Sequence, residues 1–200
     1  MHRRSKGAFI VLDGLDGCGK TLQSKALRDE LKARGFDVAY TAEPSNNTVG
    51  KFIQSILLTE KIPAEVEALL FAADRHEHLK KEILPNLEAG KVVICDRYLY
   101  SSLAYQGAQG VDVNWIRTIN SFVVKPDIAF YLDVPPDVGL NRIKRKRTVL
   151  ERIDLQVKVR EKYLELVREG ELVLVDSNRS VEAVKTELTN SAIRRLGQPS

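Results

Sequence analysis

Five short strand-like runs constrain the fold of this chain more than any other feature. They cover residues 8–12, 36–41, 91–95, 127–132 and 172–175, and stretches with helical spacing separate them. Several of the runs are apolar throughout, which is typical of strands buried on both faces. Buried strands that alternate with helices form a parallel sheet. The sequence therefore predicts an α/β fold with a five-stranded parallel sheet flanked by helices, and with ligands bound beyond the carboxyl ends of the strands.

Helical patterns cover most of the remaining chain. We expect helices at residues 20–34, 48–58, 63–87, 138–146, 155–168 and 181–196, a further piece that starts at Ser101, and a run from an N-cap at Asp112 to Val123. Pro85 either kinks or ends the third helix, because proline removes a helical hydrogen bond. No repeat, linker or low-complexity stretch divides the 200 residues, so a single domain over residues 1–200 is expected.

Composition narrows the class of protein. Hydrophobic residues make up 44% of the chain, charged residues make up 29%, and the net charge is +4. These values are ordinary for a globular protein and exclude a disordered or collagen-like chain. No apolar stretch approaches the roughly 20 residues of a membrane helix or forms a secretory signal. The two cysteines, Cys18 and Cys95, have no metal-site or redox spacing. We therefore expect a cytoplasmic protein with reduced thiols and no membrane partner.

The strongest local motif lies between the first strand and the first helix. Residues 14–21 read Gly-Leu-Asp-Gly-Cys-Gly-Lys-Thr and match the P-loop pattern G-x-x-x-x-G-K-[ST]. Glycines let backbone N–H groups turn inward around phosphate oxygens, and the following helix adds the positive end of its dipole. Lys20 would reach the outer phosphates, and Thr21 would offer its hydroxyl to Mg²⁺. The predicted nucleoside triphosphate site comprises Gly14, Gly17, Cys18, Gly19, Lys20 and Thr21. Within it, Cys18 is expected to fill space rather than to react.

A second polar segment follows the third strand and begins with Asp96 and Arg97. An acid at the carboxyl end of a buried parallel strand can orient Mg²⁺ or its water ligands. The neighbouring arginine can bridge two phosphate groups through its planar guanidinium. A purely structural ion pair between the two side chains is the alternative. The chain contains no Asn-Lys-x-Asp tetrapeptide for guanine, which disfavours a GTPase.

The motifs taken together resemble the thymidylate kinase family. Residues 96–98 (Asp-Arg-Tyr) followed by 101–107 (Ser-Ser-Leu-Ala-Tyr-Gln-Gly) are similar to its signature, as are residues 69–75, 41–44 and 175–182. The resemblance spans essentially the whole chain. It implies a three-layer P-loop kinase fold with a short Arg-rich lid at about 142–153, and transfer of the γ-phosphoryl group of ATP to dTMP to give dTDP. It also implies Mg²⁺ as cofactor and a homodimer.

The resemblance assigns roles in acceptor binding. Phe71 would stack on thymine, Arg75 would donate to a thymine carbonyl, and Ser102 would bind the base edge. Tyr105 would leave no room for a 2′-hydroxyl, and Asp16 would hold the 3′-hydroxyl or a metal-bound water. The implied dTMP-binding set is Asp16, Phe71, Arg75, Arg97, Ser102, Tyr105 and Gln106.

The resemblance also assigns a catalytic role to a basic segment. Residues 142–147 hold five basic residues and no acidic one. In the family a lid lies here, and its arginines neutralise charge on the moving phosphoryl group. The implied catalytic set is Lys20, Arg97, Asp16, Arg145, Arg147 and Arg152, with Arg142 on ATP. Gly17 stands where some members carry a basic residue, and members without that residue load arginines into the lid.

Two departures from the family pattern and one pair of histidines complete the expectations. Ala42 stands where an arginine is common, which could weaken acceptor binding, and Asp13 stands where a glutamate is common. His76 and His78 are spaced so that they point apart on a helix, and we expect both at the surface without a metal.

Three other functions stay open. One is a kinase for another nucleoside monophosphate or small metabolite, and one is a catalytically weak nucleotide-binding module of the same fold. The third is nucleic-acid binding through residues 142–147, which the absence of interleaved aromatic residues disfavours. We expect no nucleic-acid partner.

Overall fold

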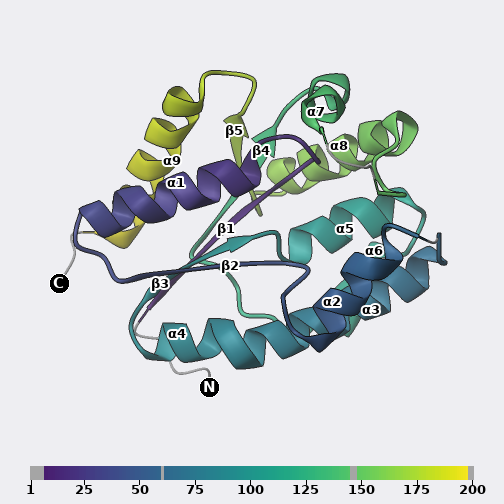
Figure 1. Cartoon of the computed structure of the whole chain (residues 1–200), viewed down its shortest axis with the longest axis horizontal. Coiled ribbons are helices and arrows are strands. Elements are labelled where there is room, and N and C mark those ends of the chain that lie inside the picture. The colour runs from purple at the N-terminus through teal and green to yellow at the C-terminus, as the bar shows by residue number, and fades with distance from the viewer. Residues whose placement is uncertain (1–6, 60, 145–147, 198–200) are drawn as a thin grey trace.

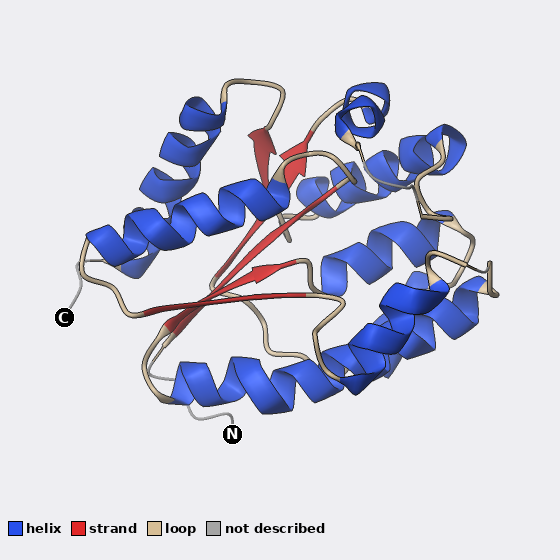
Figure 2. Cartoon of the chain, in the orientation of Figure 1, coloured by secondary structure: helices blue, strands red, loops and turns tan. Residues whose placement is uncertain are grey.

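The computed structural model describes residues 7–59, 61–144 and 148–197. Five parallel strands form one sheet in the order β2-β3-β1-β4-β5 (Figures 1 and 2). This confirms the predicted five-stranded parallel sheet. The strands are β1 (Ala8–Gly14), β2 (Val38–Ala42), β3 (Val92–Asp96), β4 (Ile128–Asp133) and β5 (Val173–Asp176).

Helices cover both faces of the sheet and give the fold three layers. Figure 1 shows α1 and α9 together on one face, whereas α4, α5 and α8 lie on the other. Right-handed crossovers between parallel strands place the helices in this way. The helical segments are α1 (Lys20–Ala33), α2 (Thr48–Ile56), α3 (Ala64–His78), η1 (Leu79–Ile83), α4 (Leu84–Glu88), α5 (Leu99–Ala108), α6 (Val113–Ile119), α7 (Pro136–Arg142), α8 (Ile153–Arg168) and α9 (Val181–Leu196).

The long helix expected at 63–87 is three joined segments, and Pro85 does not end it. A π-helical stretch, η1, precedes the proline, and α4 continues to Glu88. Proline lacks the N–H that an α-helix would use at this position. A wide turn before the proline changes the hydrogen-bond spacing, so the chain continues without a break.

Two helices are shorter than the sequence predicts. Helix α7 ends at Arg142 instead of residue 146, and α6 ends at Ile119 instead of Val123. The expected N-cap of α6 is confirmed, because the Asp112 carboxylate accepts a hydrogen bond of 2.9 Å from the Asn114 amide. No helix in the described part of the chain is long and apolar enough to cross a membrane.

Strand register brings the chemical motifs to one edge of the sheet. Leu12 of the central strand β1 pairs with Asp96 of β3, and Gly14 pairs with Leu132 of β4. The middle of β1 is fully buried, with Ile10 at 0% exposure. The polar residues that follow these strands therefore meet over a rigid apolar core, at the carboxyl edge where α/β folds bind ligands.

Candidate active site

The P-loop is shaped by glycines whose conformations other residues rarely adopt. Gly17 has φ 76°, and Gly19 has φ 93° at the N-cap of α1. A Cβ atom at Gly17 would lie 1.9 Å from the carbonyl oxygen of Gly139 in α7. The loop and α7 are therefore in backbone contact, and position 17 cannot carry a basic side chain in this arrangement.

Lys20 lines one cavity and lies close to Asp16, which lines another. Its Nζ donates to the carbonyl oxygen of Leu15 at 2.9 Å and lies 3.8 Å from Oδ1 of Asp16. The side chain is buried but reaches a cavity of about 550 Å³ that we call the P-loop cavity. The described residues that line the P-loop cavity are Gly17, Cys18, Gly19, Lys20, Thr21, Leu22, Gln23, Arg142, Ser177, Arg179, Val181 and Val184.

The far wall of the P-loop cavity comes from the segment after β5. Ser177 donates its hydroxyl to the carbonyl oxygen of Cys18 at 2.6 Å, and Arg142 donates to Asn178 Oδ1 at 3.4 Å. Arg179 donates to the carbonyl oxygen of Asp176 and forms an ion pair with Glu187. Arg142 was predicted here. Arg179 was missed, since a single arginine in a loop carries no motif.

Cys18 behaves as the sequence predicts. The side chain is fully buried, and burial raises the pKa of its thiol even though the Lys20 charge acts to lower it. A protonated, enclosed thiol is a poor nucleophile. Cys18 therefore fills space beneath the loop.

The two predicted magnesium ligands are in contact. The Thr21 hydroxyl, on the first turn of α1, donates to Oδ2 of Asp96 at the end of β3. Asp96 is 5% exposed, and its Oδ1 is buried without a hydrogen-bond partner among the described residues. A carboxylate oxygen in that state beside a hydroxyl and a phosphate loop fits a hard divalent cation. The residues present are therefore suited to Mg²⁺.

Arg97 joins the P-loop to a second cavity. It is the one non-glycine residue with positive φ in the described chain, at 73°. Its Nη1 donates to the carbonyl oxygen of Gly14 at 3.2 Å and to Ser101 Oγ at 3.0 Å, and its Nη2 forms an ion pair with Asp16. Strained backbone at such a position is found where surrounding contacts impose it. The contacts here hold the guanidinium in one place.

Asp13 supports the turn that carries Arg97. Its carboxylate accepts hydrogen bonds from the Tyr98 and Ser101 amides at 3.2 and 3.1 Å. It also accepts from the Tyr163 hydroxyl of α8 at 2.6 Å. Asp13, which stands where a glutamate is common, therefore stabilises the loop after β3 through hydrogen bonds.

The second cavity has a volume of about 330 Å³, and we call it the Phe71 cavity. Six of the seven predicted acceptor residues line it, among them Phe71 from α3 and three residues from α5. The Tyr105 hydroxyl donates to Asp16 Oδ2 at 2.9 Å. The described lining residues are Asp16, Pro44, Gln54, Leu57, Leu58, Phe71, Arg97, Ser101, Ser102, Tyr105, Gln106, Thr148, Leu150 and Glu151.

Arg75 lies behind this cavity rather than in its wall. It is 1% exposed and is not among the described lining residues. Its guanidinium donates to Glu43 at 2.9 Å, to Asn120 at 2.6 Å, and to the Ser102 hydroxyl at 3.1 Å. A fourth bond, at 3.1 Å, reaches the carbonyl oxygen of Tyr98. Arg75 therefore meets the cavity through Ser102, and its predicted bond to a base stays a prediction.

The lid arginines are placed only in part. Arg145 and Arg147 lie outside the described residues. Arg152 is exposed, forms an ion pair of 2.7 Å with Asp154, and does not line the P-loop cavity or the Phe71 cavity among the described residues. The lid does reach the Phe71 cavity through Thr148, Leu150 and Glu151. The structure does not bring Arg152 together with the other predicted catalytic residues, and its catalytic role stays a prediction.

The expectation for His78 is wrong. Its side chain is fully buried and bonds to Glu43, whereas His76 is exposed as expected. Glu43 belongs to a motif that was noticed but given no role. Two other residues near the site were missed, Gln156 and Tyr163, both on α8. Their spacing of seven residues places them on one helical face, which is the signal that was available.

Comparison with known proteins agrees with this geometry. The family model for thymidylate kinase matches residues 12–188. A probable thymidylate kinase of Pyrococcus horikoshii is 48% identical, with 92% of this chain and 94% of the relative covered. One from Methanocaldococcus jannaschii is 47% identical, with coverage of 90% and 93%. A thymidylate kinase of Acholeplasma laidlawii is 38% identical, with coverage of 94% and 100%. The match includes the P-loop and both cavities, and the chain therefore belongs to the thymidylate kinase family.

Proposed function

We propose that the chain transfers the γ-phosphoryl group of ATP to dTMP, with ATP in the P-loop cavity and dTMP in the Phe71 cavity. One observation carries the proposal. Asp16 is in polar contact with both Arg97 and Lys20, and so links two residues of the Phe71 cavity wall to one of the P-loop cavity. A donor phosphate on Lys20 and an acceptor phosphate on Arg97 would then be neighbours, as direct transfer requires.

Catalysis would rest on positioning and charge. Phosphoryl transfer has little covalent work for a protein to do, so fixed cations that face the developing charge supply most of the effect. Lys20 and Arg97 are held by carbonyl and carboxylate oxygens before substrate binds, which lowers the cost of ordering them. Mg²⁺ held by Asp96 and Thr21 would neutralise charge on the ATP phosphates. Arg145 and Arg147 are proposed to close over ATP.

Acceptor selection is supported by the shape of the Phe71 cavity. Phe71 offers a flat apolar face for a base. Ser102 Oγ accepts from Arg75, so its own proton is available for a carbonyl oxygen of thymine. Tyr105 is 4% exposed and is tied to Asp16, so its ring cannot move aside for a ribose 2′-hydroxyl.

An assay of ADP release with ATP, Mg²⁺ and a panel of dTMP, dUMP, UMP, CMP and AMP tests the proposal. We expect dTMP to have the highest kcat/KM. Preference for another monophosphate would assign the chain to that acceptor. Absence of turnover with every acceptor, together with retained ATP binding, would make it a binding module.

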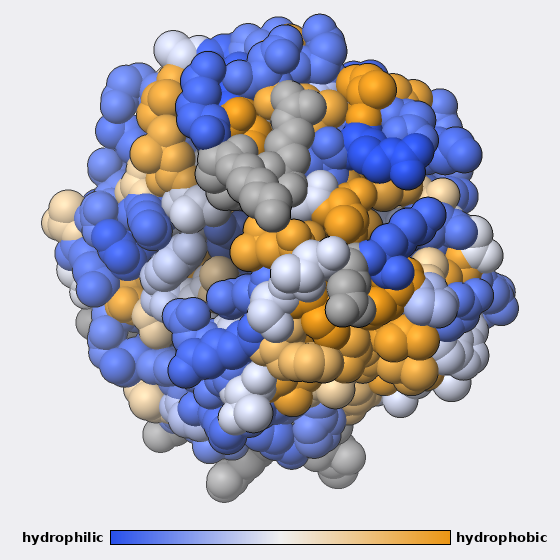
Figure 3. Space-filling model, turned by 45° about the vertical axis from the view of Figure 1, so that its right-hand side comes forward, coloured by the Kyte–Doolittle hydropathy of each residue, from blue (hydrophilic) through white to orange (hydrophobic). Residues whose placement is uncertain are grey.

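We also propose a homodimer that uses α3. Val66, Leu69, Ala73 and His76 are exposed at helical spacing on α3, with Val66 42% and Leu69 50% exposed. Phe52 of the adjacent α2 is 53% exposed. Figure 3 shows apolar surface gathered on this side of the molecule. An apolar helical stripe left in contact with water favours a partner, and a second copy would cover it.

Light scattering on the Leu69→Glu variant tests the dimer. We expect a monomer, because a charge in the centre of an apolar interface is costly. The matched control is Val157→Glu, at an exposed apolar position on α8. If Leu69→Glu keeps the mass of the unmodified protein, this interface is wrong.

The two free, buried cysteines favour a reducing compartment, which supports the proposed cytoplasmic location. We propose no nucleic-acid partner, and a filter-binding assay with DNA tests this.

A further inference from the structure

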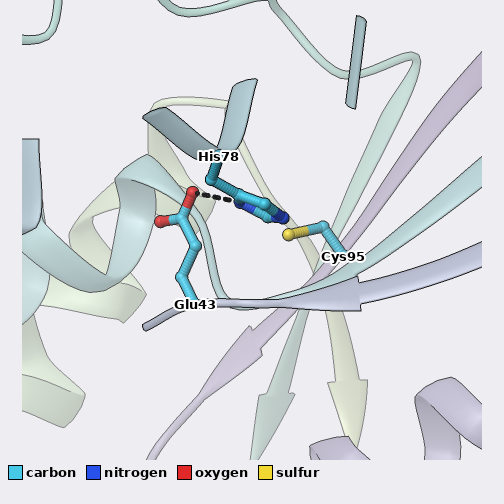
Figure 4. Close-up of side chains that lie close together, drawn as sticks. All are labelled: Glu43, His78 and Cys95. Atoms are coloured by element: carbon cyan, nitrogen blue, oxygen red, sulfur yellow. Dashed lines mark hydrogen bonds and ion pairs between the residues drawn. The ribbon is translucent and has the colours of Figure 1, made fainter. Parts of the chain in front are cut away.

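His78 lies in a buried cluster with Glu43 and Cys95 (Figure 4). Its Nδ1 lies 3.2 Å from Oε1 of Glu43, and its Nε2 lies 2.5 Å from the Thr41 hydroxyl oxygen. The second oxygen of Glu43 accepts from Nε of Arg75 at 2.9 Å. A chain of three contacts therefore runs from β2 through His78 and Glu43 to Arg75.

The number of available protons decides the charge of His78. The Thr41 hydroxyl has one proton, and it points to Oε2 of Glu82 at 2.9 Å, because an ionised carboxylate can only accept. Thr41 must then accept from Nε2 of His78. Glu43 is also an acceptor, so Nδ1 must donate as well. An imidazole that donates from both nitrogens carries a positive charge.

We propose that His78 is a buried imidazolium that acts as a positioning residue, because it orients Glu43 and, through Glu43, the Arg75 guanidinium behind the acceptor base. The inference rests on the proposed function only in naming the bound base as the acceptor. Arg75 in turn donates to Ser102, which lines the Phe71 cavity. The charge on His78 is therefore connected to the cavity wall through residues that do not touch ATP.

The charges around the ring balance when His78 is positive. The titratable groups that face it are Glu43 from the loop after β2, Glu82 from η1 at 3.7 Å and Cys95 from β3. Arg75, on the same helix, shares Glu43. Two carboxylates then meet two cations, with Glu43 buried between Arg75 and His78 and with Glu82 partly exposed to solvent.

The same cluster has the residue types of a metal site, but its atoms are already occupied. Glu43, His78 and Cys95 place their ligand atoms within 4.8 Å of one another. The Cys95 thiol donates to the carbonyl oxygen of Arg97 at 2.9 Å, and burial raises the pKa of this thiol well above its usual range. The Arg75 cation also lies on Glu43. A metal ion would need a thiolate from Cys95 and a Glu43 carboxylate that is not shared with Arg75, so the donor set favours a proton on His78 over a metal ion.

Nitrogen NMR of the three histidines tests the charge directly. At about pH 8, most imidazoles are neutral, and exposed His76 serves as the internal control. We expect both ring nitrogens of His78 to carry protons while His76 is neutral, with assignment from His78→Gln. A neutral His78 ring would overturn the proposal, as would a shift of its signals on addition of one equivalent of Zn²⁺.

Steady-state kinetics test the positioning role. In His78→Gln we expect KM for dTMP to rise about tenfold, because a hydrogen bond to a charged group is lost, while kcat and KM for ATP stay within about twofold. Glu43→Gln should give the same split, and the control Lys32→Gln, an exposed change on α1, should change neither KM. Equal KM for dTMP in His78→Gln and the unmodified protein would overturn the proposal, as would equal losses in all three constants.

A second variant keeps the test decisive if His78→Gln fails to fold. Thr41→Val removes the Nε2 acceptor with little change of volume, and we expect it to shift KM for dTMP in the same direction. Failure of the proposed function remains distinguishable. If the unmodified protein prefers another monophosphate, that acceptor replaces dTMP in the KM measurements, and the NMR result still decides the charge of His78.

Discussion

The P-loop cavity and the Phe71 cavity are built from different kinds of groups. One wall of the P-loop cavity is a continuous stretch of backbone, with two glycines at positive φ and a helix N-terminus. The Phe71 cavity is formed by side chains from α3, α5 and the lid. These side chains depend on buried partners behind the wall: Ser102 accepts from Arg75, which in turn donates to Glu43 and Asn120.

This difference has a physical consequence. A backbone site is specified by local conformation, so it is sensitive to any Cβ that changes the loop. A side-chain site is specified by hydrogen bonds between distant elements, so it is sensitive to residues that never touch the ligand. The predictions below test whether the two cavities fail in these separate ways.

The largest expected effect is in Lys20→Ala. Removal of the cation that faces the outer phosphates should lower kcat by about 10²–10³-fold. Isothermal titration should show unchanged dTMP affinity, because Lys20 does not line the Phe71 cavity and its nearest approach to Asp16 is 3.8 Å. Lys32→Ala, an exposed change on the same helix, is the control. A loss of dTMP affinity as large as the loss of kcat would show that the two cavities do not function independently.

The next effect separates steric contact from backbone conformation in the P-loop. In Gly17→Ala the new Cβ would meet the Gly139 carbonyl, whereas Gly110→Ala also has positive φ but has no atom within 4 Å. Both variants are destabilised because alanine disfavours a positive φ, and overpacking lowers the free energy of unfolding by about 1–3 kcal/mol more at position 17 alone. Urea unfolding measures the difference in free energy. Equal destabilisation would mean that α7 moves freely away from the loop.

The same contrast explains what could be predicted from sequence. The P-loop is contiguous, so its spacing alone indicated Lys20 and Thr21. The central strands β1, β3 and β4 were predictable because burial on both faces leaves a continuous apolar run. Helix ends were less predictable. Helix α6 ends at Ile119, and the side chain of its C-cap residue Asn120 binds Arg75; a bond between such distant residues leaves no local pattern.

The Phe71 cavity was predictable in membership but not in arrangement. The resemblance indicated Phe71, Ser102 and Tyr105, and these residues do line one cavity. It did not show that Arg75 stands behind Ser102. The surface placement of His78 was wrong because its partners Glu43 and Thr41 lie 35 and 37 residues away. Helical spacing reports which way a side chain points, not what lies there.

A smaller effect concerns the sugar. In Tyr105→Ala we expect the kcat/KM for UMP relative to dUMP to rise about tenfold, because loss of the ring opens space for a 2′-hydroxyl. Tyr105→Phe keeps the ring and loses only the bond to Asp16, so the ratio should stay within about twofold. The ratio cancels any general loss of activity. An unchanged ratio in Tyr105→Ala would remove this residue from sugar selection.

The smallest effect concerns an ion pair that joins the two regions. Arg160 of α8 binds both carboxylate oxygens of Asp133 at 2.8 and 2.7 Å. Helix α8 also carries Gln156, which donates to Leu150 in the Phe71 cavity wall, while the Asp133 carbonyl accepts from Ser177 of the P-loop cavity. Arg152 and Asp154 form an exposed pair on the same helix and serve as the control.

The sign of the pH dependence follows from Asp133. Burial acts to raise the pKa of Asp133, but hydrogen bonds from Arg160 and Tyr131 outweigh it and lower the pKa below its usual value. A depressed folded-state pKa stabilises the protein at neutral pH, and this stabilisation is lost as pH falls through that pKa. Arg160→Gln should therefore lower the free energy of unfolding by at most about 1 kcal/mol at pH 7, since the pair is partly exposed. The difference should shrink below about pH 4, whereas Arg152→Gln should leave the unfolding midpoint unchanged.

Constant kcat and KM in Arg160→Gln would show that the two cavities keep their geometry without this link, and a change in KM for one substrate alone would identify the cavity that depends on it.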